Sequence, residues 1–305
     1  MVYERGITEM NIDFVSKYKI FVAISLVIII AGLAVMIFQG LNLGIDFKGG
    51  TVIYVNIGKP YSPDDIRSIL SSQGIEATVV QVGDNKQDAI IRMRYMENQE
   101  EIQQRLIDAL KEKYDLTDER FSVDTVGPTI GKDLTRNAIL STVISWVFIL
   151  IYVGIRFEFK SGVAAIVALV HDVLIMVAAA ALLRTQINSP FVAAVLTIIG
   201  YSINDTIVIF DRVRENQKRF GKKLSMAEIV NRSINESLTR TINTSLTTLF
   251  TVTALYVFGV ESIKEFSLPM LVGIISGVYS TIFIAGPLWV EWSERAERRR
   301  LATAK

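Results

Sequence analysis

Long hydrophobic runs dominate the chain, and one polar segment interrupts them near the N-terminus. A helix needs about 20 apolar residues to cross the hydrocarbon core of a bilayer. Six stretches approach that length, at residues 20–38, 138–155, 163–183, 191–210, 244–258 and 266–290. The fifth is short as an apolar run, so we expect its helix to begin earlier, near Ser233. The pattern predicts an α-helical polytopic membrane protein with six transmembrane helices.

Residues 40–128 have the mixed polarity of a folded domain outside the bilayer. Residues 51–57, 77–82, 89–94 and 121–126 read as strands, by alternation or by their place between turn residues. Pro63 and Gly74 bracket a predicted helix over residues 62–73. A second helix is predicted over 98–114, where Leu106 and Leu110 share one face. The order βαββαβ predicts a small α+β ferredoxin-like domain.

Basic residues in short connections predict the orientation of a membrane protein. They gather after the fourth span and in the C-terminal tail, at Arg212, Arg214, Lys218, Arg219, Lys222, Lys223, Arg295, Arg298, Arg299 and Arg300. We therefore expect both termini in the cytoplasm and the 40–128 domain outside. The expected organisation is an N-terminal cytoplasmic segment and first helix at 1–39, the extracytoplasmic domain at 40–128, a five-helix bundle at 129–292 with a cytoplasmic loop at 211–236, and a basic tail at 293–305.

Inside the expected cytoplasmic loop, Ser225 and Glu228 have the spacing of a capping box, in which each residue caps the other's backbone N–H. This predicts a short helix that lies along the membrane surface, either as a solvated helical linker or as a docking surface.

Composition excludes several classes of function. The 305 residues are 50% hydrophobic, and the net charge of +1 gives no reason to expect nucleic acid as a partner. There is no cysteine and only one histidine, His171, so thiolate and His-rich metal sites are excluded. The sequence also lacks a P-loop and any paired nucleophile and base. We expect no catalytic residues, no metal and no cofactor.

Asp205 is the residue around which a function can be built, because it interrupts the apolar run of the fourth span beside Asn204. A carboxylate at the centre of a spanning helix costs about 2.5–3.5 kcal/mol on insertion scales, and such groups commonly serve proton relays. The fifth span carries a polar stripe at Ser237, Arg240, Thr241, Thr244, Thr248 and Thr251. Arg240 stabilises an ionised Asp205 if the two lie close, and their separation favours proton uptake. Alternatively, the pair is a permanent lock, or Arg240 extends to the interface.

Asp172 lies as deep in the third span as Asp205 does in the fourth, next to His171. We expect it either to join the proton relay or to pack helices together with His171. Two connectors containing glycine flank the 40–128 domain, with Gly44, Gly49 and Gly50 before it and Gly127 and Gly131 after it. Glycine permits backbone conformations that other residues avoid. These positions are either hinges for the outer domain or ordinary loop residues.

Five segments resemble motifs of the SecD/SecF family, most closely its smaller SecF branch: residues 43–51 (LGIDFKGGT), 126–131 (VGPTIG), 200–208 (GYSINDTIV), 210–216 (FDRVREN) and 239–245 (TRTINTS). The resemblance covers nearly the whole chain. It implies half of a transporter of the resistance-nodulation-division superfamily in the bacterial inner membrane, completed by SecD. It also implies a role in moving unfolded preproteins through the SecYEG translocon with the proton gradient as energy source. By the same resemblance, Asp205 and Arg240 correspond to the family's intramembrane aspartate and its partner arginine.

Two other functions remain open from the residues. The chain could be half of a proton-coupled exporter of lipids or small molecules, although the outer domain is small for a drug-sized cleft. It could also be a membrane scaffold, in which buried polar residues hold helices together. A substitution of Asp205 separates the scaffold from a transporter. In a scaffold it lowers the amount of assembled complex, whereas in a transporter it lowers the activity of each complex.

Overall fold

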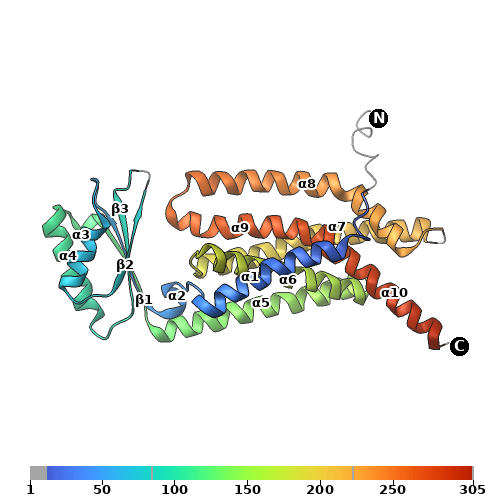
Figure 1. Cartoon of the computed structure of the whole chain (residues 1–305), viewed down its shortest axis with the longest axis horizontal. Helices are drawn as coiled ribbons and strands as arrows, with labels where there is room; N and C mark the ends of the chain where they lie inside the picture. Colours follow the sequence, from blue (N-terminus) through green and yellow to red (C-terminus); the bar gives the residue numbers. More distant parts are fainter. Residues whose placement is uncertain (1–11, 84, 222, 304–305) are drawn as a thin grey trace.

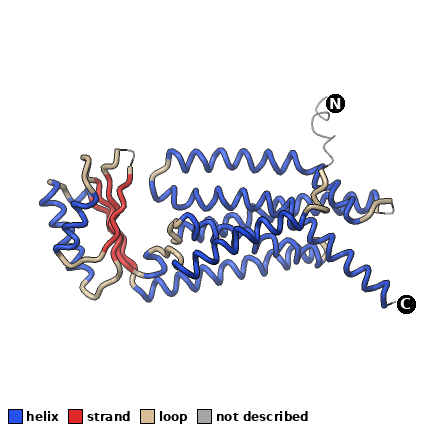
Figure 2. Tube along the Cα trace, in the orientation of Figure 1, coloured by secondary structure: helices blue, strands red, loops and turns tan. Residues whose placement is uncertain are grey.

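A computed structural model describes residues 12–303 apart from 84 and 222. A bundle of long helices carries a small sheet-containing domain at one end (Figure 1). All the strands in the described part of the chain lie in that domain, as the colouring by secondary structure shows (Figure 2). The start of α1 and the end of α10 lie at the opposite end of the bundle (Figure 1).

The small domain confirms the predicted ferredoxin-like topology. Its elements are β1 (Gly50–Asn56), α3 (Pro63–Ser72), β2 (Ala77–Val82), β3 (Asp88–Met93), α4 (Gln99–Tyr114), a 3-10 turn η1 (Asp118–Arg120) and β4 (Phe121–Val126). The strand order is β2-β3-β1-β4, and all three strand pairs are antiparallel. Helices α3 and α4 lie on the face of the sheet that points away from the bundle (Figure 1).

The core of this domain forms where the alternating strand residues meet the two helices. Ile53 and Ile91 project from the central strands and Leu106 and Leu110 from α4, and all four are fully buried. The Ser62 hydroxyl accepts the backbone N–H of Asp64 and so caps α3. The domain therefore has its own hydrophobic core, separate from that of the bundle.

Among the described residues, six helices are long and apolar enough to cross a membrane, which confirms the predicted spans. Their elements are α1 (Tyr18–Gln39), α5 (Pro128–Arg156), α6 (Phe159–Leu183), α7 (Ser189–Phe220), α8 (Met226–Phe258) and a last span formed by α9 (Glu261–Ser280), the π-helical turn η2 (Thr281–Ala285) and α10 (Gly286–Thr303). Small residues allow close packing: a side chain at Gly273 would collide with Ile198 of α7, and one at Gly32 with Ala178 of α6.

The segment expected as a loop over residues 211–236 is instead most of a helical hairpin. Helix α7 continues to Phe220 and α8 begins at Met226, so only a short turn joins them. The capping box is confirmed, with the Ser225 N–H donating to Glu228 at 2.7 Å. However, it opens the fifth spanning helix, and the prediction of a separate short helix on the membrane surface was wrong. Hydropathy missed this because charged residues on a helix that leaves the bilayer look like a loop.

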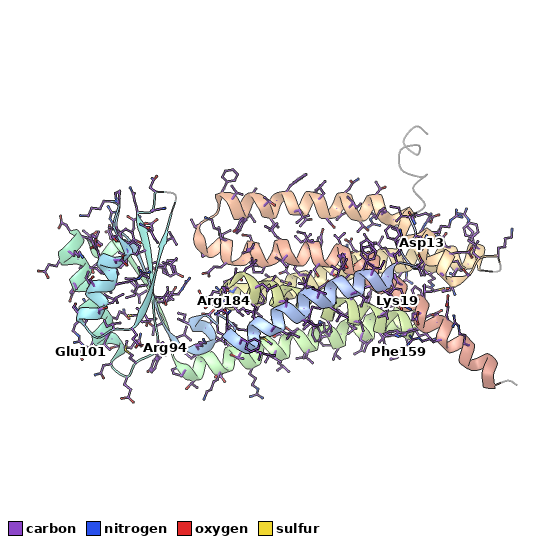
Figure 3. All side chains as sticks on the ribbon, viewed as in Figure 1. Asp13, Lys19, Arg94, Glu101, Phe159 and Arg184 are labelled. Carbon is purple, nitrogen blue, oxygen red and sulfur yellow. The ribbon has the colours of Figure 1, made fainter. Side chains whose placement is uncertain are left out.

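Successive connections alternate between the two ends of the bundle. Arg184, after α6, lies at the end next to the sheet, whereas Lys19 and Phe159 lie at the opposite end (Figure 3). The end of the bundle that carries the basic hairpin is thus opposite to the end that carries the small domain.

The two connectors to the small domain lie side by side. Gly50 pairs with Val126 across β1 and β4, and a side chain at Gly49 would press on Pro128, the first residue of α5. Gly49 and Gly50 have φ values of 76° and 144°, which favour glycine. The chain thus enters and leaves the small domain at adjacent points.

Candidate proton-coupling site

Asp205 lies on the inner side of α7, and its side chain is buried with 6% exposure. The sequence sets α7 in place at its N-terminus, where the Asn188 side chain accepts the Phe191 N–H and Pro190 occupies the first turn. The Asp205 carboxylate accepts a hydrogen bond from Ser245 of α8 and lies within the electrostatic field of Arg240. The arginine that the sequence singled out therefore acts on Asp205 through its charge, although no ion pair within 4.0 Å joins the two among the described residues.

Ser245 is a member of this site that the sequence analysis missed. It also receives a long hydrogen bond of 3.5 Å from the Tyr201 hydroxyl, which lies 3.2 Å from Thr248. Its spacing of four residues from Thr241 could have revealed it, because Ser237, Thr241 and Ser245 are all buried on one face of α8.

The remaining polar residues of the predicted stripe do not all face Asp205. Thr244 and Thr251 are exposed on α8, and Thr251 donates to the carbonyl of its own helix at Thr247. Asn204 is exposed on α7 and makes no hydrogen bond within the described part of the chain. The predicted relay member Asn204 thus points away from the pair.

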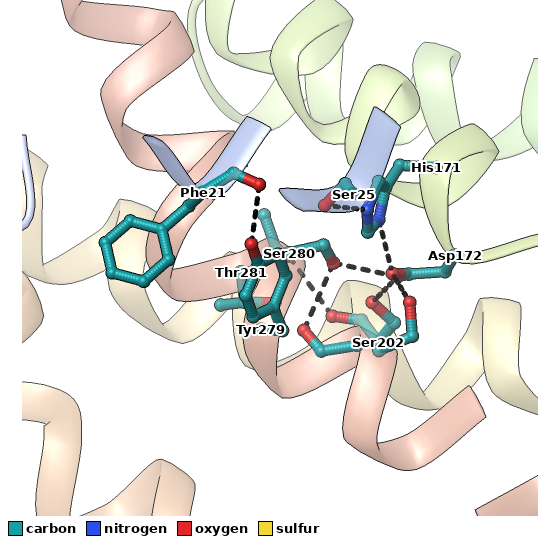
Figure 4. A network of polar contacts seen from close by, with 11 residues as sticks. Phe21, Ser25, His171, Asp172, Ser202, Tyr279, Ser280 and Thr281 are labelled. Atoms are coloured by element: carbon teal, nitrogen blue, oxygen red, sulfur yellow. Dashed lines mark hydrogen bonds and ion pairs between the residues drawn. The ribbon is translucent and has the colours of Figure 1, made fainter. Parts of the chain in front are cut away.

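Asp172 lies at a second polar centre, where three serine donors and a histidine ring nitrogen from three helices meet (Figure 4). Ser202 and Ser280 donate to Oδ2 at 2.7 and 2.9 Å, and Ser276 donates to Oδ1 at 2.7 Å. The Nδ1 of His171 lies 3.2 Å from Oδ1. A carboxylate offers about four lone-pair sites, so these partners fill its capacity. Asp172 is 1% exposed and joins α6, α7 and α9.

His171 extends this centre to the first span. Its Nε2 lies 2.9 Å from the Ser25 hydroxyl of α1, and its ring stacks on that of Tyr279 with the ring centroids 6.1 Å apart. Tyr279 in turn donates to the carbonyl of Phe21 at 2.6 Å (Figure 4). The network therefore connects α1 with α6 and α9, as expected for polar side chains that hold helices together in a membrane.

The two carboxylates are neighbours but separate centres. Ser202, a donor to Asp172, precedes Asp205 by one turn of α7. No direct hydrogen bond joins Asp172 to Asp205 among the residues that the structure describes. Nor do residues 12–303, without 84 and 222, contain a cluster of side chains that could hold a metal ion. The Asp172 carboxylate is thus filled by hydrogen bonds from neighbouring helices, whereas the buried Asp205 carboxylate lies in the electrostatic field of Arg240.

Two family profiles match the chain. "Protein export membrane protein SecD/SecF, C-terminal" matches residues 106–295, and "SecD/SecF GG Motif" matches residues 34–60. The chain belongs to the SecD/SecF family. The glycines of the second motif include Gly49 and Gly50, which form the connector to the small domain.

Similar proteins support this membership along the whole chain. The protein translocase subunit SecF of Rhodothermus marinus is 40% identical, over 97% of this chain and 98% of that protein. The protein translocase subunit SecDF of Bacillus subtilis is also 40% identical, over 93% of this chain but only 38% of that protein. The crystal structure of SecDF from Thermus thermophilus matches with a TM-score of 0.85 and 36% identity, over 95% of this chain and 40% of that chain. The chain thus spans about two fifths of the length of these two SecDF proteins.

Proposed function

We propose that the chain is a SecF-type subunit of the Sec protein-export machinery, and that it works with SecD to couple the proton gradient to preprotein movement through SecYEG. The observation that carries the proposal is the buried Asp205 facing Arg240 and Ser245 between two spanning helices. A proton on Asp205 cancels its attraction to Arg240, and its loss restores that attraction. The proton gradient is the energy source, and no cofactor or enzymatic step is required.

A path for coupling runs along α7 to the small domain. The first turn of α7 contacts the connector α2 (Ile45–Lys48), where Asp46 accepts the Ser189 N–H at 2.6 Å. Asn188, the N-cap of α7, donates to Glu265 of α9, and Glu265 pairs with Arg92 of β3 at 3.2 Å. A shift of α7 against α8 therefore acts on residues that hold the outer domain.

The two adjacent connectors give that domain a single pivot. Gly49, Gly50 and Gly127 lie where β1 and β4 leave the sheet, and Gly131 packs its bare Cα against the carbonyl of Phe47. We propose that the domain moves about this point, and that Gly44 and Gly131 keep the connector close to the bundle.

An uncovered polar surface supports SecD as the partner. Asn204 of α7 and Asn243, Thr244 and Thr247 of α8 are exposed at positions within spanning helices. Polar side chains in contact with lipid are costly, and small or polar residues pack well against another helix. We propose that SecD helices cover this surface and contribute to the site, while lipid covers the apolar exposed faces of α1 and α5.

We propose that the chain is an inner-membrane protein with both termini in the cytoplasm. The basic hairpin between α7 and α8 and the start of α1 lie at the end opposite to the small domain. From the positive-inside rule we propose that this end is cytoplasmic and that the domain lies outside, where it can act on emerging unfolded preprotein.

One observation favours the exporter alternative. A cleft of about 770 Å³ lies between the sheet and the α8–α9 connection, and its lining includes Tyr54, Arg120, Phe258 and Lys264. This volume is within the range of small-molecule sites. Efflux of a small molecule from vesicles that contain the chain and SecD would support this function over preprotein export.

The test replaces the chromosomal copy with Asp205→Asn and follows the release of a secreted protein. We expect release to lose its gradient-dependent part while the amount of purified SecD-containing complex stays normal. Asp133→Asn is the matched control, since it makes the same change at an exposed carboxylate. Normal release in the Asp205 variant contradicts the coupling role, and a loss of complex with normal activity per complex supports the scaffold.

A further inference from the structure

The cytoplasmic half of the α7–α8 hairpin contains a second charged cluster, which we call the hairpin clamp: Arg212, Asn216, Ser233 and Glu236. Arg212 Nε donates to the Glu236 carboxylate at 2.6 Å, and Asn216 Nδ2 donates to the same oxygen at 2.8 Å. Asn216 also donates to the buried Ser233 hydroxyl at 3.0 Å. The clamp therefore joins α7 to α8 just inside the turn.

The clamp and the Asp205 site belong to one antiparallel register. Asn216 meets Ser233 near the turn, and Tyr201 meets Thr248 deeper in the bundle. The separation along α7 equals the separation along α8, so the two helices run side by side without a slip. In this register Arg240 lies between the clamp and Asp205.

Arg240 has two carboxylates within reach of its helix position. Glu236 precedes it by four residues on α8, and a glutamate that precedes an arginine by four residues is the favourable orientation for an ion pair. Asp205 faces it from α7. Within the described residues, no hydrogen bond or ion pair holds the Arg240 guanidinium, whereas Glu236 accepts from Arg212, Asn216 and, on its own helix, Arg232.

We infer that Arg212 and Asn216 are positioning residues, which occupy the Glu236 carboxylate and thereby leave the Arg240 guanidinium to Asp205. Without them, Glu236 competes with Asp205 for the arginine. The inference rests on the proposed coupling role of Asp205. It assigns a function to Arg212 and Asn216, two residues of the 210–216 motif that do not contact Asp205.

The test measures the modification of Asp205 by a hydrophobic carbodiimide in the full chain, followed by mass spectrometry of the labelled peptide. The reagent attacks a protonated carboxyl, so it reports whether Arg240 is engaged with Asp205, and it needs no transport. We expect Arg212→Gln to raise the labelling rate by about 1.4- to 2.3-fold, the range that one competing pair of this spacing can shift. Glu236→Gln is expected to label like the wild type, since Arg212 keeps Glu215 as a partner at 2.7 Å.

The double variant R212Q/E236Q separates positioning from stability. With the competing carboxylate removed, we expect labelling to return to the wild-type rate, and gradient-driven release to return with it. If the double variant labels as fast as R212Q, the clamp only stabilises the hairpin and the inference is wrong. The proposed function fails separately, through normal release in Asp205→Asn, whatever the labelling shows.

Discussion

Asp172→Asn is expected to destabilise the bundle by an amount that follows from its four hydrogen bonds. Two donors meet each carboxylate oxygen. The replacement keeps one oxygen and turns the other into an amide NH2 that donates, so the two groups bonded to that oxygen lose their acceptor. A hydrogen bond between spanning helices contributes about 0.6 kcal/mol on average and at most about 1.7 kcal/mol. We therefore expect a loss of about 1–3 kcal/mol in the free energy of unfolding.

The assay is equilibrium unfolding of the purified chain in mixed micelles, as the proportion of a denaturing detergent is raised. Ser145→Ala is the matched control, because the Ser145 hydroxyl donates only to the Ser141 carbonyl of its own helix at 2.8 Å. The control is expected to change the unfolding free energy by less than about 0.5 kcal/mol.

The outcome also decides between the two roles that the sequence left open for Asp172. A stability loss with gradient-driven release intact makes Asp172 a lock between α6, α7 and α9. An unchanged unfolding free energy with release abolished would refute this reasoning and would place Asp172 in the proton relay.

Four other variants test the rest of the fold. Burial, with smaller effects of Tyr114 and Asp88, raises the pKa of Tyr61 to about 12. The unfolded chain loses that proton near pH 10, so stability should fall between pH 10 and 12, less steeply in Tyr61→Phe, as alkaline unfolding will show. Leu106→Ala should lower the free energy of unfolding of the small domain by about 2–5 kcal/mol, because Leu106 is fully buried. Denaturant unfolding, followed by a signal from that domain, measures this loss. Gly50→Ala should cost about 1–3 kcal/mol in the same assay, since its φ is 144°. Ser225→Ala should cost about 0.5–2 kcal/mol through the lost cap, measured by detergent unfolding; no change would refute the cap.

Much of the fold could be predicted because its signals are local. Period-two alternation and turn residues located the strands to within a residue of their observed bounds, and long apolar runs located the spans. The helical hairpin could not be recognised by hydropathy, because helices α7 and α8 extend past the apolar runs into charged sequence. There, the capping box at Ser225 was the better indicator, and it was assigned to a separate helix.

The site was predictable only where a charged residue interrupts an apolar run. Asp205, Arg240 and Asp172 stand out for this reason, whereas Ser202, Ser276 and Ser280 look like ordinary small residues of packed helices. Only the tertiary structure brings these serines, distant in sequence, to one carboxylate. The exposed side of α7 that carries Asn204 was likewise invisible, because exposure depends on how the bundle packs.

The most direct measurement of the central claim uses membrane vesicles that contain the chain, SecD and SecYEG, with a preprotein arrested partway across. A proton gradient is imposed, and completion of transport is followed for the wild type and for Asp205→Asn at equal amounts of complex. We expect the wild type to complete preprotein transport and the Asp205→Asn variant to leave the preprotein arrested. Equal completion in both would contradict this expectation and would make Asp205 a packing residue.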